Sequence, residues 1–486
     1  MLSSTRRSHR ALARDRRGLD VLKASPYLVR RMTTTHPRHG PTLVSAGTHP
    51  MPPYSWPRPS TVPNSAHFWR KVPLWKDIPS KDFLSWRWGV KNIVESRNKL
   101  AEFLDAVLPA EVPHAEGFGG QQSRDEFVAD IWAGIKKSTM AVRVMPYVLG
   151  RINWEDPAND PIFRQFIPLA SIMIHNHRLA KLDPLKEKDD RPIEGVVHRY
   201  PDKALFLPTS VCPTYCLYCT RSYEIGANTD LVTKEPFKLN RARLEAAFAY
   251  IESQEGLHDI VVSGGDAFYL SPDIIELIGD RLIGMKNIER FRFASKGLAV
   301  APHRFLDEED PWTDALIRVS DKARRAGKHM ALHTHFNHPN EISWVTEQAS
   351  LKLLRAGVTV RNQTVLLRGI NDNVGTMLTL IQKLAKMVIQ PYYVYQCDMA
   401  PYIEHLRTPL RTIQDMEAKI QGTIAGFLMP KFVVDLPGGG GKRLASLCES
   451  YDQRTGVSTF TQPALKGKGR ENKVYEYHDP IDTLLS

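Results

Sequence analysis

The chain has no run of about 18 or more consecutive apolar residues, so the sequence predicts no membrane-spanning helix and no membrane partner. Cysteine is scarce: there are five in 486 residues, and three of them lie within eight positions. A disulfide framework needs an even set of cysteines in a small secreted chain, which excludes that class. With 42% hydrophobic residues, the chain can instead bury the core of a large enzyme.

Acidic residues are rare at the amino end, where residues 1–50 hold ten Lys and Arg against Asp15 and Asp20. This segment therefore carries +8 of the net charge of +12, which leaves +4 for the other 436 residues. Because the body is nearly balanced, the charge argues against a nucleic-acid partner. Residues 1–32 are rich in Arg and Ser, a composition typical of mitochondrial transit peptides. We expect a mitochondrial location, with the cytoplasm as the alternative.

Composition divides the chain into four expected parts. Residues 1–64 combine the basic targeting segment with a linker rich in Pro, Ser, Thr, Gly and His. Residues 65–195 place apolar side chains at three- and four-residue spacing, which predicts a helical region interrupted by the prolines of "WEDPANDP". A barrel with the reactive site is expected over 196–442, followed by a C-terminal extension over 443–486.

Short β-branched runs alternate with helical periods from residue 196 onward. The expected strands are 203–208, 258–262, 290–294, 329–333, 363–367, 389–395 and 431–435, with helices such as 241–253, 341–355 and 373–387 between them. This alternation predicts an α/β fold with a parallel sheet and crossover helices. Six or seven units are too few for a closed eight-fold barrel, so we expect a partial (β/α)6-type barrel. Its functional groups should lie at the C-terminal ends of the strands.

The three clustered cysteines, Cys212, Cys216 and Cys219, have the spacing C-x3-C-x2-C and follow the first expected strand. Each thiolate can hold one iron of a four-iron cluster, which leaves the fourth iron open to an exogenous molecule. A zinc site would need a fourth ligand in a second paired unit, and none is present. The spacing therefore predicts a reactive iron–sulfur cluster.

Two further segments follow expected strands. "SGGDAFYL" contains a Gly-Gly pair, Gly264 and Gly265, which allows the backbone to approach a ligand closely. "HTHFNHPNE" holds three histidines without an acidic or Cys partner at ligand spacing, so we expect His333, His335 and His338 to line the active site rather than bind a metal.

The last expected strand runs into "VVDLPGGGGKRLAS". A phosphate-binding P-loop would need Gly where Leu436 stands and Ser or Thr where Arg443 stands, so that reading fails. What remains is Lys442 on a flexible, sterically open loop beside the barrel mouth. Such a lysine suits a Schiff base with a carbonyl cofactor.

From about residue 80 to 445 the chain resembles the lysine 2,3-aminomutase family of radical S-adenosylmethionine enzymes. The resembling segments are "WRWGVKN", "DPANDPIFRQFIP", "HRYPDKALF", the three-Cys loop, "VVSGGDA", "HTHFNHPNE", "NQTVLLRGIND", "QPYYVYQCD", "EHLRTP" and "FVVDLPGGGGK". The resemblance implies a radical S-adenosylmethionine barrel and three cofactors: a [4Fe-4S] cluster, S-adenosylmethionine and pyridoxal 5′-phosphate (PLP). It also implies an isomerase that moves the α-amino group of L-lysine to the β carbon to give β-lysine.

The resemblance assigns roles to matching positions. Cys212, Cys216 and Cys219 would hold the cluster, and Lys442 would be the catalytic Schiff-base lysine. S-adenosylmethionine would contact Tyr218, Ser263, Gly264, Gly265 and Asp266. PLP would lie among Arg199, Tyr200, Lys203 and Lys442, with Lys203 in place of an expected Arg. The substrate carboxylate would bind Arg221, and its side-chain ammonium would bind Asp398 and Asp435.

The aspartate pair can also be argued from the residues. Asp398 and Asp435 end two strands that should be neighbours, and two carboxylates facing one pocket repel each other unless a cation lies between them. A lysine ε-ammonium, with three donors on a compact charge, satisfies both acids. A glutamate-directed relative should not keep two acids here.

One departure concerns zinc. Bacterial members of the family carry C-terminal cysteines that bind structural zinc together with a cysteine of a neighbouring subunit. Here Ser350 stands near the expected partner position and no Cys follows Cys448, so we expect no zinc, and Cys397 and Cys448 should be ordinary thiols. A homo-oligomer remains possible, and the cluster needs an electron donor. Two other activities stay open: an aminomutase for arginine or another basic amino acid, and a radical enzyme that modifies a macromolecule.

Overall fold

The computed structural model describes residues 67–462, 464–465, 469–470 and 472–484. The expected targeting segment and linker, 1–64, lie outside the described residues. None of the helices in the described ranges is long and apolar enough to cross a membrane. The division of the chain into four parts stays a prediction.

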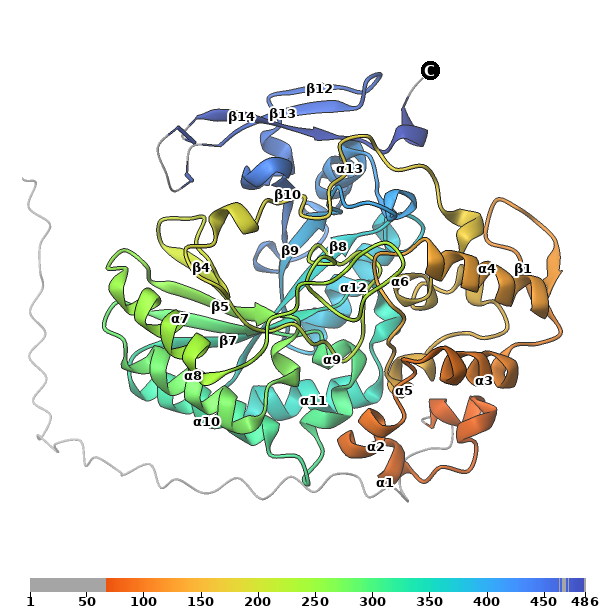
Figure 1. Ribbon diagram of the computed structural model, residues 1–486, viewed down its shortest axis with the longest axis horizontal. Helices are drawn as coiled ribbons and strands as arrows, with labels where there is room; N and C mark the ends of the chain where they lie inside the picture. The colour runs from red at the N-terminus through yellow and green to blue at the C-terminus, as the bar shows by residue number, and fades with distance from the viewer. Residues whose placement is uncertain (1–66, 463, 466–468, 471, 485–486) are drawn as a thin grey trace, which may run out of the picture. The chain divides into compact units, whose positions relative to one another are not determined.

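A nine-stranded sheet forms the centre of the fold, and seven neighbouring strands, β4 to β10, run parallel in sequence order (Figure 1). Short antiparallel strands, β3 and β11, occupy its two edges, so the sheet stays open. The strands are β3 (Val196–Val197), β4 (Lys203–Thr209), β5 (Asp259–Gly264), β6 (Arg290–Ala294), β7 (His329–His335), β8 (Thr359–Leu366), β9 (Gln390–Gln396), β10 (Lys431–Leu436) and β11 (Gly441–Leu444). The predicted partial α/β barrel is confirmed, with a parallel strand at each of the seven predicted positions.

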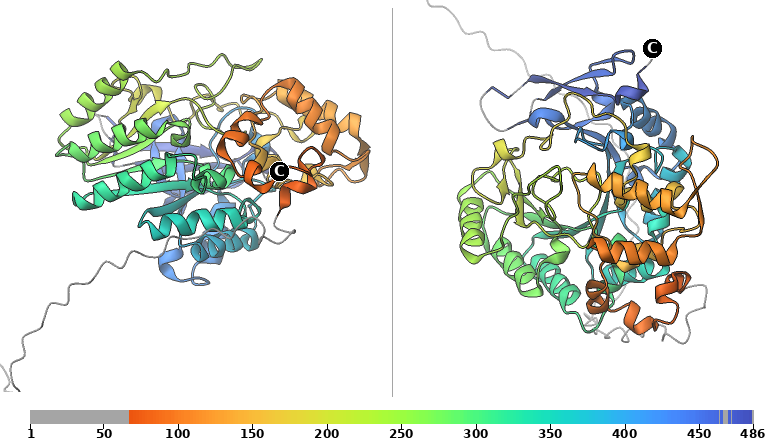
Figure 2. Two further views of the ribbon diagram at one scale, coloured as in Figure 1. Left: turned by 90° about the horizontal axis from the view of Figure 1, so that it is seen from below. Right: turned by 45° about the vertical axis from the view of Figure 1, so that its right-hand side comes forward.

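Helices on the outer face connect these strands (Figures 1 and 2). They are α7 (Arg241–Ser253), α8 (Pro272–Gly284), α9 (Gly297–Val300), α10 (Trp312–Arg325), α11 (Trp344–Arg355), α12 (Val374–Lys386) and α13 (Leu410–Ile420). Buried and half-buried residues alternate strictly along β8, as expected of a strand with helices on one face and a lined pocket on the other. In β8 the half-buried residues Gln363 and Val365 therefore face the site, whose cavity they line.

The N-terminal region contains less helix than its periodicity predicts. Its elements are α1 (Ser80–Phe83), α2 (Trp86–Lys91), α3 (Arg97–Val107), β1 (Glu111–Pro113), β2 (Gln121–Ser123), α4 (Arg124–Lys136), α5 (Pro146–Leu149) and α6 (Phe163–Phe166). Prolines limit several of them, because Pro79 caps α1 and Pro146 opens α5, where the missing N–H of proline is tolerated. The predicted helical region over 65–195 does not extend to its end, since the chain from Ile167 to Gly195 is mostly irregular.

The C-terminal extension forms a separate antiparallel sheet of β12 (Ser450–Asp452), β13 (Val457–Gln462) and β14 (Lys473–His478). The hydroxyl of Tyr477 on β14 accepts a hydrogen bond from Gln396 Nε2 and donates one to the Cys397 carbonyl, each at 3.1 Å. The small sheet is therefore bound to the end of β9, next to the site.

Candidate active site

A cavity of about 420 Å³ opens at the carboxyl ends of the parallel strands. Each residue assigned to a site from the sequence lines it, with the single exception of Gly264. Of the three histidines, His333 and His335 line the cavity and His338 does not. The expectation that functional groups gather at the strand ends is met by this placement, while the individual roles stay predictions.

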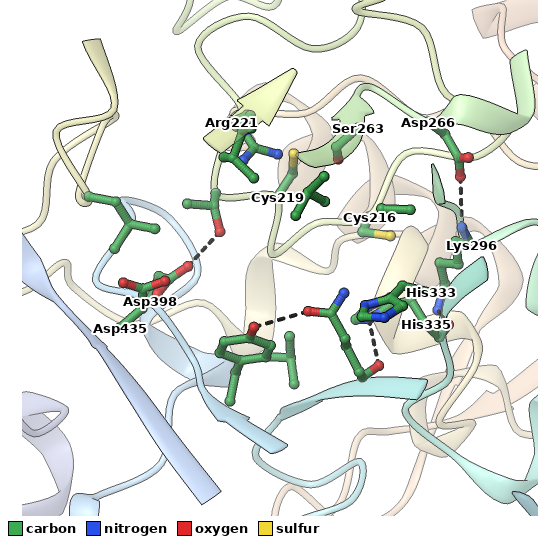
Figure 3. Close-up of a pocket in the computed structure, with 18 of the residues that line it drawn as sticks. Cys216, Cys219, Arg221, Ser263, Asp266, Lys296, His333, His335, Asp398 and Asp435 are labelled. Atoms are coloured by element: carbon green, nitrogen blue, oxygen red, sulfur yellow. Dashed lines mark hydrogen bonds between the residues drawn. The ribbon is translucent and has the colours of Figure 1, made fainter. Parts of the chain in front are cut away.

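The cysteine loop follows β4 directly, and Cys216 and Cys219 face the cavity in Figure 3. All three thiols are free, and Met140, Tyr215 and Ile225 pack around two of them, Cys212 and Cys219. Burial raises the pKa of the Cys216 thiol to about 11, with Lys296 opposing the shift. At this pKa the Cys216 thiol is protonated near neutral pH, and a bound iron would favour its thiolate.

No group of three His, Cys, Asp or Glu within the described ranges is arranged to hold one metal ion. A four-iron cluster makes a different demand, since each cysteine binds its own iron at a separate corner. Three free thiols on one loop at the wall of a cavity fit that demand.

The protein's own backbone leaves no room for a side chain at either glycine of the pair after β5. A side chain at Gly264 would collide with the Thr209 carbonyl, and one at Gly265 with the backbone of Val211. Gly264 also has a φ of 103°, a conformation that favours glycine. The sequence predicted that the Gly-Gly backbone approaches a ligand closely. In the structure it approaches the chain at Thr209 and Val211, which leads from β4 into the cysteine loop. The two carboxylate oxygens of Asp266 accept hydrogen bonds from the backbone N–H groups of Phe268 and Lys296, each at 2.8 Å.

Tyr218 belongs to a buried polar network that the sequence did not indicate. Its hydroxyl accepts a hydrogen bond from Asn337 Nδ2 at 2.6 Å and lies 3.2 Å from Gln165 Oε1 and 3.1 Å from His335 Nε2. The network ties the cysteine loop to the end of β7 and to the N-terminal region. The tyrosine ring is thereby fixed at the cavity wall, 7% exposed.

The sequence predicted Lys442 on a flexible, open loop, and this prediction is wrong. Lys442 lies on β11, paired antiparallel with β10 so that it stands directly opposite Asp435. Gly438, Gly439 and Gly441 all have positive φ, so they form the tight turn of this hairpin rather than a mobile tether. The Lys442 ammonium donates to Asp435 Oδ2 at 2.6 Å, and the hydroxyl of Tyr200 accepts from the Lys442 backbone N–H at 2.8 Å.

Asp398 and Asp435 lie side by side at the ends of neighbouring strands, as predicted (Figure 3). Burial, together with the negative charge of Asp435, raises the pKa of Asp398 to about 7. The hydroxyl of Thr220 donates to Asp398 Oδ2 at 2.5 Å. Among the described residues, Asp435 Oδ1 is buried without a hydrogen-bond partner, with the Arg199 Nη1 cation 4.0 Å away, so this oxygen can accept a further donor.

Arg221 is held by Glu187, a residue that sequence reasoning missed. The guanidinium donates from Nε and Nη2 to the two Glu187 oxygens at 2.6 and 2.7 Å. Burial opposes ionisation of Glu187, yet Arg221 holds its pKa below the usual range. Glu187 stands in "LKEKDD", which reads as a solvated charged loop, and only the folded chain shows that it enters the cavity.

The remaining cations near Lys442 also have partners. Arg199 donates from Nε to Asp190 Oδ2 at 2.6 Å and from Nη2 to the Leu185 carbonyl. The Lys203 ammonium lies 4.3 Å from the ring centroid of Tyr200. Lys203 beside Tyr200 and Arg199 beside Asp435 are two cationic donors suited to a phosphate. Together with the amine of Lys442, they fit PLP.

An open parallel barrel with three clustered cysteines after its first parallel strand defines the radical S-adenosylmethionine class of enzymes. L-lysine 2,3-aminomutase of Clostridium subterminale is 36% identical over 374 residues, covering 77% of this chain and 80% of that protein. The Bacillus subtilis enzyme of the same name is 33% identical over 377 residues, 77% of this chain and 71% of that protein. The chain belongs to the lysine 2,3-aminomutase family, whose cofactors are a [4Fe-4S] cluster, S-adenosylmethionine and PLP.

Glutamate 2,3-aminomutase of Clostridioides difficile is 31% identical over 299 residues, covering 62% of this chain and 66% of that protein. Relatives of this chain are therefore named for a basic amino acid, lysine, and for an acidic one, glutamate. No family model matches the chain. The structure of Streptococcus suis SuiB bound to S-adenosylmethionine overlaps with a TM-score of 0.34 at 10% identity, over 51% of this chain and 52% of that one.

Proposed function

We propose that the chain converts L-lysine to β-lysine by 2,3-amino migration. The observation that carries the proposal is the acid pair Asp398 and Asp435 in a cavity shared with Lys442 and the cysteine loop. Asp435 already binds a primary ammonium, that of Lys442, at 2.6 Å. Because burial and the charge of Asp435 raise the pKa of Asp398 to about 7, Asp398 is about half protonated at pH 7. An ammonium ligand would satisfy both acids, whereas a glutamate side chain would be repelled.

The other residues orient the substrate. Arg221 is the cation available to the α-carboxylate, and Glu187 fixes the direction of its guanidinium. Thr220, adjacent to Arg221, bonds to Asp398, so the two ends of the substrate site are connected through one short segment. When bound, the cluster with S-adenosylmethionine supplies hydrogen-atom abstraction and return, and PLP carries the migrating nitrogen. The task of the protein is to hold the reacting carbons in register and exclude water.

Arginine or another basic amino acid is the alternative substrate, because a guanidinium also pairs well with carboxylates. A macromolecular substrate is disfavoured, since it would give no role to Lys442 opposite Asp435.

The test is an anaerobic assay of the reconstituted protein with reductant, S-adenosylmethionine, PLP and isotopically labelled lysine, with mass-spectrometric separation of α- from β-lysine. We expect β-lysine from the wild type and none from Lys442→Ala or Cys216→Ser. Cys448→Ser is the matched control, because Cys448 lies outside the cavity and bonds to the Ser450 carbonyl. Deoxyadenosine without β-lysine would refute lysine as substrate, and arginine would then be assayed.

The proposal includes an electron donor for the cluster, a possible homo-oligomer and a mitochondrial location. The composition of residues 1–32, which is rich in Arg and Ser, supports the mitochondrial location. Import of a reporter fused to residues 1–64 would test it.

A further inference from the structure

Lys234 is a buried cation without a carboxylate partner among the described residues. Its side chain is 6% exposed. The other buried Lys and Arg side chains of the described ranges all pair with an acid: Arg199 with Asp190, Arg243 with Glu194, Lys296 with Glu341, Arg304 with Asp310, and Arg407 with Glu404. Burying an unpaired ammonium is costly, so a cation retained in this position calls for an anion.

The ammonium of Lys234 joins two segments, the chain at Thr139 and the chain just after Cys219. It donates to the carbonyl oxygens of Thr139 and Ser222. Ser222 in turn donates its backbone N–H to the Cys219 carbonyl at 3.1 Å. Met140, the residue after Thr139, packs in the cluster of side chains that includes Cys212 and Cys219. Carbonyl oxygens solvate the charge of Lys234 but do not neutralise it.

The electrostatics agree with this placement. Burial lowers the pKa of Lys234 to about 8, and a negative charge on Cys219 would oppose this shift. The contacts lead to the same place, since Ser222, whose carbonyl accepts from Lys234, bonds through its N–H to Cys219 of the cysteine loop.

We propose that Lys234 is the buried counter-charge of the iron–sulfur cluster and raises its reduction potential. Three thiolates around a doubly positive four-iron core leave a net negative charge. One-electron reduction by an external low-potential donor adds another negative charge without moving a proton. A fixed ammonium nearby stabilises the reduced form more than the oxidised form, since attraction grows with the charge of the cluster.

The experiment measures the midpoint potential of the reconstituted full chain by dithionite titration followed by electron paramagnetic resonance, without lysine or S-adenosylmethionine. Lys234→Gln keeps a donor for one carbonyl but removes the charge, and Lys234→Met removes both. We expect the reduction equilibrium to fall about tenfold in each, equal to about 59 mV more negative for a one-electron couple. Lys234→Arg keeps the charge and should stay near the wild-type potential.

Lys328→Met is the matched control. Lys328 also donates to two carbonyl oxygens, those of Leu282 and Met285, but these lie at the end of helix α8 and not beside the cysteine loop. Its loss should leave the potential unchanged. An unshifted potential in Lys234→Gln or Lys234→Met would overturn the proposal. If these two variants fail to retain iron while Lys234→Arg retains it, the charge is needed to hold the cluster, which supports the proposal; iron loss in all three would make Lys234 merely structural and overturn it.

Discussion

Burial and the charge of Asp435 raise the pKa of Asp398 to about 7, and this shift has a consequence for substrate binding. Below pH 7 the carboxyl of the lysine-free protein is protonated, whereas a bound ammonium favours the ionised form. Lysine binding should therefore release a proton below pH 7, and the KM for lysine should rise by up to about tenfold per pH unit as the pH falls further. Above pH 7 the effect disappears.

Calorimetric titration of the holoenzyme with lysine in two buffers of different ionisation enthalpy measures the released proton. Asp398→Asn is the control, since it cannot titrate; its affinity should be severely reduced and its proton release lost. Equal proton release by the wild type and Asp398→Asn would show that another group titrates.

Glu187 acts through Arg221, which gives a second prediction. Glu187→Gln preserves size but leaves the half-buried guanidinium without its bidentate anion, so Arg221 loses its fixed direction. The KM for lysine should rise at least about tenfold, because charged hydrogen bonds contribute about 1.5–3 kcal/mol each. Inhibition by lysinamide, which has no carboxylate, should be unaffected.

Glu235→Gln is the matched control, since Glu235 pairs at 2.6 Å with Lys188 and is largely exposed. Equal losses for lysine and lysinamide in Glu187→Gln would mean that Glu187 supports the fold and not the carboxylate end of the site.

At the scale of elements, the sequence predicts the bounds of helices and strands best where burial makes apolar residues recur at a regular spacing. Both β6 and α7 have the bounds that the sequence predicts, because alternation and helical spacing are enforced by packing on both faces of a crossover unit. The irregular chain from Ile167 to Gly195 has no such period, and Glu187 in it was therefore missed. Lys442 was placed in the cavity, but its pairing with β10 was not foreseen, since a Gly run suggests freedom and not a hairpin.

The turn after β5 gives a third prediction. In Gly265→Ala the new methyl group would meet the backbone of Val211, which cannot yield without moving Cys212. We expect a loss of about 1–3 kcal/mol in unfolding free energy and a reduced iron content, because the cysteine loop must shift. Thermal unfolding and iron analysis measure both effects.

Gly284→Ala is its matched control. A methyl group there has nothing within 4 Å, and Gly284 ends helix α8. The substitution should be neutral or stabilise by up to about 1 kcal/mol. Full iron content in Gly265→Ala would show that the cysteine loop tolerates displacement.

At the scale of the whole molecule, the C-terminal extension supports the site from outside the barrel. Tyr475 packs on Gly440, where an added Cβ would lie 2.7 Å from the ring, and Gln462 Nε2 donates to the Lys442 carbonyl at 3.3 Å. Tyr477 bonds to Gln396 and Cys397, the two residues before Asp398. One small sheet thus contacts both the lysine hairpin and the aspartate loop, a connection between distant segments that no local pattern in the sequence records.

This connection leads to the fourth prediction. Tyr477→Phe removes the hydroxyl that fixes the end of β9, which leaves the buried Cys397 carbonyl without its donor at a cost of about 1–3 kcal/mol. Because Asp398 follows directly, we expect the KM for lysine to rise several-fold, while iron content and the absorbance of bound PLP stay unchanged. Tyr475→Phe, on the same strand, keeps its ring packing and loses a hydroxyl that makes no hydrogen bond within the described part of the chain, so its KM should match the wild type. If both variants behave alike in steady-state kinetics, the small sheet stabilises the fold without positioning Asp398; a rise confined to Tyr477→Phe assigns the extension to the substrate site.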